Sequence, residues 1–458
     1  MEPLFGTDGI RGVAGEPPLD CDTVYRVGFC LTEYLRDLDR RPRILVARDT
    51  RISGPWLEAV LNRAILDAGG VTEMCGVIST PAVSFLTARE GAQAGIMISA
   101  SHNPYQDNGI KIFSATGLKL NDAVEEHLEL KILSSSRTCP PEFSISDQFT
   151  PEVLSDTFPA QGELYTRHLR ECLPRDFDLK GMRLVVDCAH GALSHIAPDF
   201  LSDLGAGVDR LHCEPNGRNI NLNAGALHLE RLREKVRSSG ADLGIAFDGD
   251  ADRVMFVDSH GDPRDGDDVL YLLARYTDFG TAPRIVVSTV MANLGLELAL
   301  KDLGFGLARA AVGDRYVLEE MLRLGAIVGG EQSGHIILLQ LGQTGDGFLT
   351  TLKVLEIIRE RNSGLHELCR PLKRFPQVLT NVPVRERTPF GAIPGLQDAE
   401  AALKGKLGSR CRILLRYSGT EKMARIMVEG DDRAIVEEGA RSLAAVLHKH
   451  ASRSPGTS

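Results

Sequence analysis

Apolar residues recur along this 458-residue chain in two patterns, and each predicts a different secondary structure. Short aliphatic runs are typical of strands that are buried on both faces. They lie at residues 44–47, 96–98, 184–186, 243–246 and 285–287. Between them, apolar residues at three- and four-residue spacing predict helices, for example over 24–34 and 57–65. Strands that alternate with helices predict an α/β fold with largely parallel sheets.

Several domains are expected from the length and from the turn-rich segments. At roughly 150 residues per domain, the length predicts about three domains with room for a fourth. Serines at 134–136 and prolines at 140–141 interrupt helix and strand alike, so the first domain should end nearby. A shorter series begins at 374 and ends in a helix predicted over 431–448. The last residues, 451–458, are predicted to form a disordered tail.

Composition narrows the class of protein. Hydrophobic residues at 43% and charged residues at 25% are ordinary for a globular protein, which excludes wholesale disorder. Lys and Arg total 52 against 62 Asp and Glu, a net charge of −10, so nucleic acid is not an expected partner. No apolar stretch approaches the roughly 18 residues of a membrane helix, and the N-terminus has no signal-peptide pattern. We therefore expect a cytoplasmic protein that does not contact membranes.

The nine cysteines are odd in number, scattered, and never spaced as C-x-x-C. Such a distribution is typical of reduced thiols in a cytosolic protein. We therefore expect no disulfide.

Three carboxylates at alternate positions, Asp248, Asp250 and Asp252, directly follow an apolar strand. Such charges must repel one another or share a cation, and oxygen ligands suit a hard ion such as Mg²⁺. A calcium-binding EF-hand loop is excluded, because Arg253 and Ser259 stand where that loop needs Gly and Glu. A solvated acidic turn, or a phosphoaspartate enzyme with Asp248 as its nucleophile, are the remaining alternatives.

A second polar segment, 99–104, follows the strand at 96–98. Ligands meet parallel sheets where strands end, so Ser101 is a candidate exposed nucleophile, with Lys111 and His102 nearby to manage protons and charge. A Ser–His–Asp hydrolase fits poorly, because no G-x-S-x-G motif is present and adjacent side chains diverge on an extended chain. The alternative is a plain turn that closes the strand.

Two glycine-containing segments are candidates for ligand contact. Residues 416–421 place Arg416 before two hydroxyl side chains and Gly419, which suits a phosphate cradle. Residues 329–335 combine glycines with alternate hydrogen-bonding side chains, which suits sugar hydroxyls. A polar hairpin and a glycine-rich turn are the respective alternatives. Residues 5–12 around Arg11, taken alone, favour a flexible terminal turn.

Together these segments resemble the α-D-phosphohexomutase family from residue 5 to about residue 430. Five ordered blocks support the resemblance, at 5–12, 99–104, 248–253, 330–335 and 416–421. Four supporting blocks lie at 48–53, 186–192, 215–221 and 312–317. One departure is Lys422, where the family often has proline.

The resemblance implies an α/β fold of three similar mixed α/β domains plus a smaller C-terminal α+β domain around a central cleft. It implies a phosphoserine-bearing domain at 1–150, a metal-loop domain at 151–254, a sugar-recognition domain at 255–372 and a phosphate-clamp domain at 373–450. Residues 451–458 remain outside these domains as the tail.

The resemblance also implies the site residues. Ser101 is expected to carry a phosphoryl group, and Asp248, Asp250 and Asp252 to hold Mg²⁺ together with an oxygen of that group. Near the reacting phosphate it places Arg11, Lys111, Arg253 and His335, with Lys111 moving the proton. For the sugar hydroxyls it implies Glu331 and Ser333, and for the distal phosphate Arg416, Ser418, Gly419 and Thr420, assisted by Arg425.

The implied activity is phosphoryl transfer between two ends of one sugar phosphate, through a hexose 1,6-bisphosphate that turns over within the cleft. Blocks 5–12 and 330–335 resemble the amino-sugar branch, which interconverts glucosamine 6-phosphate and glucosamine 1-phosphate for UDP-N-acetylglucosamine synthesis. The alternatives are a glucose or mannose mutase, a Mg²⁺-dependent sugar phosphatase, and a noncatalytic sugar-phosphate sensor. The expected partner is a small sugar phosphate, and the oligomeric state is left open.

Overall fold

The computed structural model describes residues 3–6, 8–143, 160–418 and 422–452. The chain forms two compact units. The larger comprises Met1–Met291 and Phe305–Arg370, and the smaller comprises Ala292–Gly304 and Pro371–Ser458. Within the described ranges, no helix is both long and apolar enough to cross a membrane.

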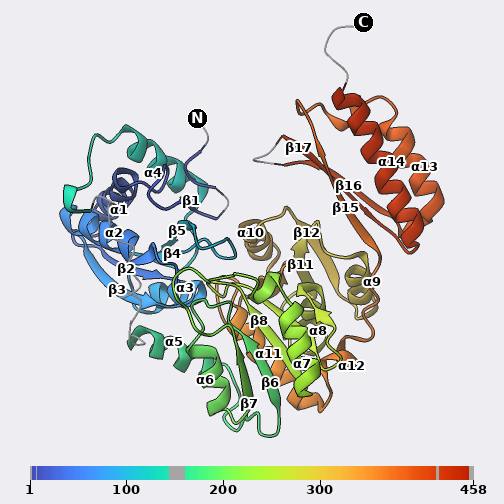
Figure 1. The fold of residues 1–458 in the computed structure, drawn as a ribbon, viewed down its shortest axis with the longest axis horizontal. Helices are drawn as coiled ribbons and strands as arrows, with labels where there is room; N and C mark the ends of the chain where they lie inside the picture. Colours follow the sequence, from blue (N-terminus) through green and yellow to red (C-terminus); the bar gives the residue numbers. More distant parts are fainter. Residues whose placement is uncertain (1–2, 7, 144–159, 419–421, 453–458) are drawn as a thin grey trace, which may run out of the picture. The chain divides into compact units, whose positions relative to one another are not determined.

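The first sheet of the larger unit has five strands in the order β1-β5-β4-β2-β3 (Figure 1). These strands are β1 (Ile10–Val13), β5 (Asp107–Ser114), β4 (Ala94–Ile98), β2 (Arg43–Arg48) and β3 (Val71–Val77). Ile44 and Val46 join one apolar core with helices α1 (Cys21–Arg36), α2 (Gly54–Asp67) and α4 (Asp122–Ser134). Helix α3 (Thr80–Arg89) packs on β4, where a Cβ at Gly95 would meet its Thr87 side chain.

The second and third sheets have the orders β10-β9-β8-β6-β7 and β12-β11-β13-β14. The strands are β6 (Arg183–Asp187), β7 (Gly207–Leu211), β8 (Leu243–Phe247), β9 (Val254–Asp258), β10 (Pro263–Arg264), β11 (Ile285–Thr289), β12 (Gly306–Ala310), β13 (Val328–Gly330) and β14 (Ile336–Leu338). The remaining helices of this unit are α5 (Ala160–Glu171), α6 (Ile196–Asp203), α7 (Glu230–Ser239), α8 (Gly266–Tyr276), α10 (Asp314–Leu324), α11 (Gly347–Arg361) and α12 (Leu365–Cys369).

The three sheets share the arrangement of four of their strands. The leading strand, β2, β6 or β11, lies between two parallel neighbours. A fourth strand, β5, β9 or β14, then pairs antiparallel with the third. The five predicted strands are confirmed, and the parallel pairing holds for β2 to β4, for β6 to β8 and for β11 to β13. The fourth is antiparallel because a short loop joins it to its neighbour, and short loops connect only antiparallel strands.

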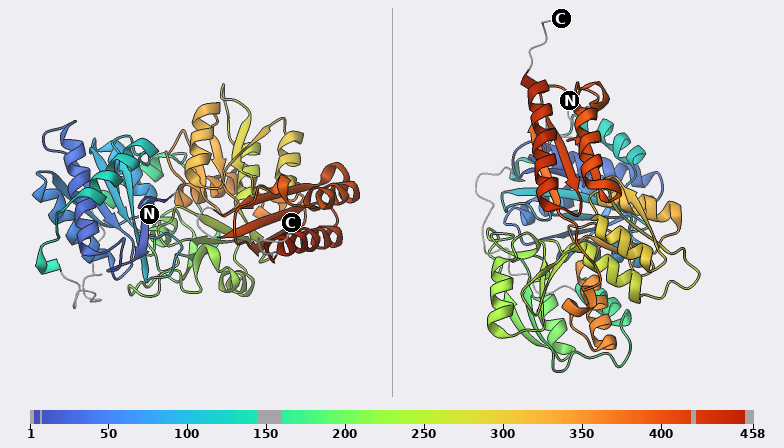
Figure 2. Two further views of the ribbon diagram at one scale, coloured as in Figure 1. Left: turned by 90° about the horizontal axis from the view of Figure 1, so that it is seen from above. Right: turned by 90° about the vertical axis from the view of Figure 1, so that its right-hand side faces the viewer.

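The smaller unit contains an antiparallel sheet in the order β15-β17-β16. Its elements are β15 (Gln377–Pro383), β16 (Arg412–Tyr417), β17 (Met423–Glu429), α9 (Leu294–Asp302), α13 (Leu396–Leu407) and α14 (Arg433–Ser452). Helices α13 and α14 lie side by side against the sheet (Figure 2), and Val382, Ile426 and Leu443 are buried between these layers. The predicted C-terminal helix is confirmed. It continues to Ser452, so the tail prediction is wrong for residues 451–452, and 453–458 lie outside the described residues.

The expectation that all cysteines are reduced is corrected at one pair. Cys21 at the start of α1 and Cys139 beyond α4 form a disulfide, and seven other cysteines are free. The segment after α4 returns to α1, where the Cys139 N–H donates to the Asp22 carboxylate over 2.7 Å. Sequence spacing gave no sign of this pair, because 118 positions separate the two cysteines.

Candidate active site

Three equivalent loops carry three of the motifs found in the sequence. Each joins the third and fourth strands of its sheet: 99–106 lies between β4 and β5, 248–253 between β8 and β9, and 331–335 between β13 and β14. The shared topology of the sheets therefore places these motifs at equivalent positions in three domains.

The three loops contact one another. The Ser101 hydroxyl donates a hydrogen bond to Asp248 over 2.6 Å, and the Val254 N–H donates to the Gly334 carbonyl over 3.1 Å. Each loop contains a residue of positive φ, namely Ser101 at 51°, Ala251 at 58° and Gly334 at 91°. Such a conformation is rare for residues other than glycine, and it turns each short loop tightly.

Ser101 is buried, and hydrogen bonds hold both its carbonyl and its hydroxyl. Its side chain is fully buried, so the expectation of an exposed nucleophile is wrong. Its carbonyl accepts hydrogen bonds from Arg51 and Asn221, each over 2.8 Å. The expectation that Ser101 and His102 diverge on an extended chain is also wrong, because the turn brings Ser101 Oγ to 3.4 Å from His102 Nδ1. Burial, with the nearby Arg253 and Arg11 charges, lowers the pKa of His102 to about 4.

The three carboxylates of the loop 248–253 form one buried cluster. Asp248, Asp250 and Asp252 are 2%, 0% and 4% exposed, and one oxygen from each lies within 4.8 Å of the others. Burial and the neighbouring Asp252 and Asp250 charges raise the pKa of Asp248 well above its ordinary value. A solvated acidic turn is therefore excluded, because these side chains do not reach water.

The backbone of this loop and of the next residue, Val254, is held from four segments of the larger unit. Thr80, at the start of α3, makes two hydrogen bonds to Asp250. Its N–H donates to the Asp250 carbonyl over 3.0 Å, and its hydroxyl donates to the Asp250 carboxylate over 2.5 Å. The Ala192 N–H donates to Gly249 and the Gly347 N–H to Ala251, over 2.8 and 3.0 Å. The contact between Val254 and Gly334 is the fourth.

A divalent cation fits this cluster. Oδ1 of Asp250 and Oδ1 of Asp252 are buried, and neither accepts a hydrogen bond from the part of the chain that the structure describes. Buried oxygens without donors are costly, and a hard cation bound by carboxylates would offset that cost.

Lys111 supplies the positive charge that is built into the cluster. Its ammonium donates to Asp250 over 2.9 Å and to Asp252 over 3.2 Å, and it lies 3.2 Å from Asp8. Burial would lower its pKa, but these three carboxylates outweigh burial and raise the pKa well above its ordinary value. The same lysine, with His335 and Arg253, holds the pKa of Asp252 well below its ordinary value although burial opposes this.

The other predicted side chains of the larger unit gather around the same cluster. Arg11 pairs with Asp8, Arg253 Nε lies 3.7 Å from Asp252, and His335 Nδ1 lies 3.8 Å from Asp252. His335 is 2% exposed and its Nε2 accepts the Gly345 N–H over 3.1 Å.

The candidate sugar-binding loop begins at Glu331. Its carboxylate accepts the Gly313 N–H over 3.1 Å and the Ser333 hydroxyl over 3.4 Å. The intervening Gln332 points elsewhere, since its side-chain amide donates to Asp267 over 3.4 Å. Glu331 and Ser333 are thus together, as the sequence predicted.

The candidate phosphate clamp belongs to the smaller unit. Arg416 in β16 and Arg425 in β17 are directly opposed, and the Arg425 guanidinium donates to the Ser418 hydroxyl over 3.4 Å. Burial and the Arg425 charge lower the pKa of Arg416. Gly419 and Thr420 lie outside the described residues.

Sequence reasoning missed three charged residues at this site. Asp8 pairs with Lys111, Arg11 and Lys119, and Lys119 donates to Asp314 over 2.5 Å. Blocks 5–12 and 312–317 contained Asp8 and Asp314 without suggesting a role. Lys119 stood in no motif, and only the fold reveals it.

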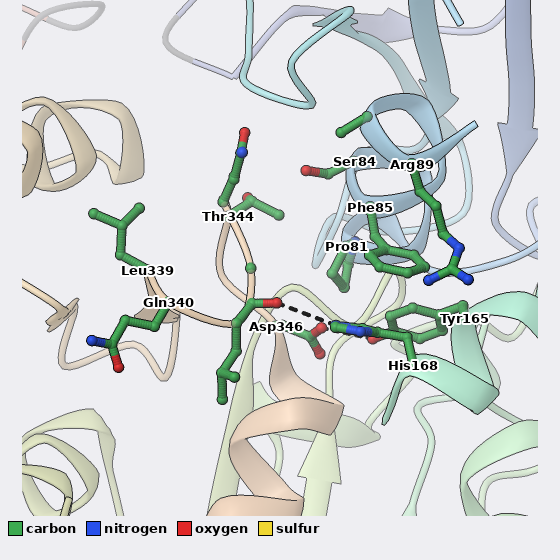
Figure 3. A pocket seen from close by; sticks show the side chains of 14 residues that line it. Pro81, Ser84, Phe85, Arg89, Tyr165, His168, Leu339, Gln340, Thr344 and Asp346 are labelled. Carbon is green, nitrogen blue, oxygen red and sulfur yellow. Dashed lines mark hydrogen bonds between the residues drawn. The ribbon is translucent and has the colours of Figure 1, made fainter. Parts of the chain in front are cut away.

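A pocket and a second group of possible metal ligands do not include Ser101. A pocket of about 360 Å³ is lined by α3, α5 and the segment 339–346, and His168 stacks on Phe85 at its edge (Figure 3). The Tyr165 hydroxyl donates a hydrogen bond to Asp346 over 2.7 Å. A second possible metal group contains Asp258, His260 and His366. Arg264 already donates to Asp258 over 2.6 Å, which supplies a cation there.

Models of four domains of one enzyme family match this chain in order. They are the phosphoglucomutase/phosphomannomutase α/β/α domains I, II and III, over residues 2–138, 163–261 and 265–375, and its C-terminal domain over 379–446. The chain belongs to the phosphoglucomutase/phosphomannomutase family. This phosphohexomutase relationship covers nearly the whole chain.

Curated proteins similar to this chain include phosphoglucosamine mutases. That of Moorella thermoacetica is 46% identical over 441 residues, covering 95% of this chain and 97% of the relative. That of Solibacter usitatus is 44% identical over 449 residues, covering 97% and 98%.

Solved structures share the fold at lower identity. A Burkholderia thailandensis phosphoglucomutase/phosphomannomutase family protein has a TM-score of 0.77 at 22% identity, covering 100% of this chain and 99% of its own. Aspergillus fumigatus N-acetylphosphoglucosamine mutase, in complex with GlcNAc-6P and magnesium, has a TM-score of 0.66 at 19% identity, covering 98% and 96%.

Proposed function

We propose that this phosphohexomutase interconverts glucosamine 6-phosphate and glucosamine 1-phosphate through a phosphoserine at Ser101. The observation that carries the proposal is the buried Ser101 hydroxyl, 2.6 Å from one carboxylate of a three-carboxylate cluster. The amino sugar is supported by phosphoglucosamine mutases at 44% and 46% identity. The enzyme is an isomerase, since phosphate changes position within one sugar.

In the first step, phosphorylated Ser101 gives its phosphoryl group to the free hydroxyl of the sugar monophosphate. The bond between phosphorus and Ser101 Oγ breaks, a bond to the sugar oxygen forms, and one proton moves from that hydroxyl to Oγ. Lys111 is proposed to move the proton, because its ammonium lies within the same cluster of carboxylates. The 1,6-bisphosphate then turns over, and Ser101 takes back the opposite phosphate.

Asp248, Asp250 and Asp252 are proposed to hold Mg²⁺ together with an oxygen of the phosphorylated Ser101. Bound Mg²⁺ would neutralise charge on the phosphoryl oxygens. The buried Oδ1 atoms of Asp250 and Asp252 support this assignment, because no residue that the structure describes donates a hydrogen bond to them.

The remaining predicted residues would position the substrate. Arg11, Arg253 and His335 would face the reacting phosphate, and Glu331 and Ser333 the sugar hydroxyls. Arg416, Ser418, Gly419, Thr420 and Arg425 would hold the distal phosphate. Together these residues would keep the attacking and leaving oxygens in line.

The wider assignments remain predictions. Hexose 1,6-bisphosphate is proposed as activator and intermediate, the cytoplasm as location, and UDP-N-acetylglucosamine synthesis as the pathway. The domain limits 1–150, 151–254, 255–372 and 373–450 belong to the same proposal.

Phosphorus NMR would test the function. The protein is mixed with Mg²⁺, a trace of hexose 1,6-bisphosphate, and glucosamine, glucose or mannose 6-phosphate in separate tubes. The fastest appearance of 1-phosphate is expected from glucosamine 6-phosphate. Faster conversion of glucose or mannose would overturn the substrate, and release of inorganic phosphate alone would show a phosphatase.

Ser101→Ala tests the nucleophile. Turnover should fall by at least about 1000-fold, because the group that carries the phosphoryl is removed. The exposed Ser238→Ala serves as control and should retain wild-type turnover. Intact mass should show one phosphoryl group on the wild type and none on Ser101→Ala. Ordinary turnover by Ser101→Ala would refute the phosphoserine.

A further inference from the structure

Asp314, the first residue of α10, lies beside the candidate sugar-binding loop. The N–H of the preceding Gly313 donates to Glu331 over 3.1 Å. Asp314 Oδ2 lies 3.9 Å from His335 Nε2 and accepts a hydrogen bond from Lys119 over 2.5 Å. This carboxylate is therefore adjacent both to the proposed reader of sugar hydroxyls and to the proposed phosphate site.

One oxygen of Asp314 remains open to a ligand. The side chain is 16% exposed, and Oδ1 accepts no hydrogen bond from any residue that the structure describes. Burial would raise the pKa of Asp314, but the Lys119 and His335 charges outweigh burial and lower it. Lys119 also contacts Asp8, so its single charge is divided between two carboxylates.

The other carboxylates of the site are engaged. Asp8 contacts Arg11, Lys111 and Lys119. Glu331 accepts hydrogen bonds on both of its oxygens. The three aspartates of the metal loop are buried in the cation cluster. Among these carboxylates, Asp314 alone combines partial exposure with an oxygen that lacks a donor within the described ranges.

We propose that Asp314 binds the ammonium group at C2 of glucosamine phosphates and so separates the amino sugar from glucose. The inference rests on the proposed function and extends it to the choice of sugar. C2 adjoins C3, so an ammonium at C2 lies next to the hydroxyl at C3, just as Asp314 lies next to the loop proposed to bind hydroxyls. A hydrogen bond between two charged groups is stronger than one to the neutral C2 hydroxyl of glucose.

Asp314→Asn tests the inference, because it removes the charge and keeps an acceptor for Lys119. We expect kcat/KM for glucosamine 6-phosphate to fall about 10- to 100-fold, while the value for glucose 6-phosphate stays within about threefold. The wild-type preference for glucosamine should also fade as pH rises and the substrate ammonium loses its proton. In Asp314→Asn that pH dependence of the preference should be absent.

Two controls separate substrate binding from positioning. Lys119→Met removes the cation beside Asp314, and it should change both sugars by the same factor. Glu319→Gln, on the exposed side of the same helix, changes the net charge equally and should leave the preference unaltered. Equal loss on both sugars in Asp314→Asn would overturn the inference and leave only a structural role.

Failure of the inference differs from failure of the proposed function. If the wild type converts glucose 6-phosphate faster than glucosamine 6-phosphate, the proposed function itself fails. If the wild type prefers glucosamine and Asp314→Asn retains the full preference, only the assignment of Asp314 fails. Thermal unfolding of each variant verifies that a native fold is being compared.

Discussion

Two regions of the molecule gather like charges, and they resolve the resulting repulsion differently. In the larger unit, Asp248, Asp250 and Asp252 crowd within one buried loop. In the smaller unit, Arg416 and Arg425 face each other across adjacent antiparallel strands. Like charges directly opposite each other destabilise a sheet. Neither arrangement is therefore favourable for folding alone.

The acidic region contains its own counter-charge, and the basic one lacks it at Arg416. Lys111 reaches Asp250 and Asp252 from β5. Arg416 forms no ion pair with any carboxylate within the described ranges. The acidic cluster is thus partly stabilised by a charge of the chain itself, whereas Arg416 carries a charge that no carboxylate of the described ranges pairs with.

The largest effect is expected for Lys111→Met, which removes the positive charge from the acidic cluster. Without this ammonium, buried carboxylates lose their partner, which costs about 3–5 kcal/mol of unfolding free energy. Turnover should fall at least about 100-fold, since Lys111 is also the proposed proton carrier. Urea unfolding and phosphorus NMR measure the two losses.

Added Mg²⁺ should restore part of the stability of Lys111→Met, because a divalent cation compensates the same carboxylates. Lys180→Met, at an exposed lysine, is the control and should match the wild type. Wild-type stability in Lys111→Met without Mg²⁺ would contradict the idea of a built-in counter-charge.

A smaller effect is expected at Arg416→Gln, which relieves the repulsion in the basic pair. KM for the sugar phosphate should rise about 10- to 100-fold with kcat largely kept, because an interaction with the distal phosphate is lost. The smaller unit should gain a few tenths of a kcal/mol in stability, in the direction opposite to Lys111→Met. Initial rates and thermal unfolding provide the measurements, with Arg410→Gln as an exposed control. An unchanged KM would remove Arg416 from substrate binding.

The smallest effect is expected at Asp346, a buried carboxylate that forms no ion pair with any residue the structure describes. Asp346 accepts hydrogen bonds from the Tyr165 hydroxyl and the Leu349 N–H, over 2.7 and 2.8 Å. Burial raises its pKa from 3.8 to about 6. Its contribution to stability is fully present below pH 3.8 and is lost as pH rises through about 6.

Asp346→Asn should therefore gain about 1 kcal/mol relative to the wild type between pH 5 and pH 8. Urea unfolding of both proteins at the two pH values checks the difference, in which the other carboxylates cancel. An Asp346→Asn effect that is independent of pH would show that the wild-type carboxyl does not titrate in this range.

The sequence predicted the strands and the motif positions well, because both depend on local patterns. Continuous aliphatic runs identified β2, β4, β6, β8 and β11, and alternate carboxylates identified the buried acidic cluster of the loop 248–253. The repeated topology of three sheets was not visible, since it lies in strand pairing and not in residue identity. The same limit hid the disulfide between Cys21 and Cys139.

The site was predicted where function concentrates in motifs, and it was missed where charge balance depends on distant contacts. Lys119 lies 195 positions from its partner Asp314, and no pattern in a single sequence connects such residues. Ser101 follows β4 as the sequence predicted, but the hydrogen bonds to its carbonyl come from Arg51 and Asn221, which lie in other segments of the chain.

The four segments that hold the loop 248–253 and Val254 are synthesised at different times. A chain leaves the ribosome from its N-terminus, so Thr80 and Ala192 are available before the loop itself is made. Gly334 and Gly347 follow much later, and both donate to or accept from the loop backbone. A nascent chain that has not reached the start of α11 lacks part of the frame around its three aspartates. The hydrogen bonds around the three aspartates are therefore complete only when most of the larger unit has been synthesised.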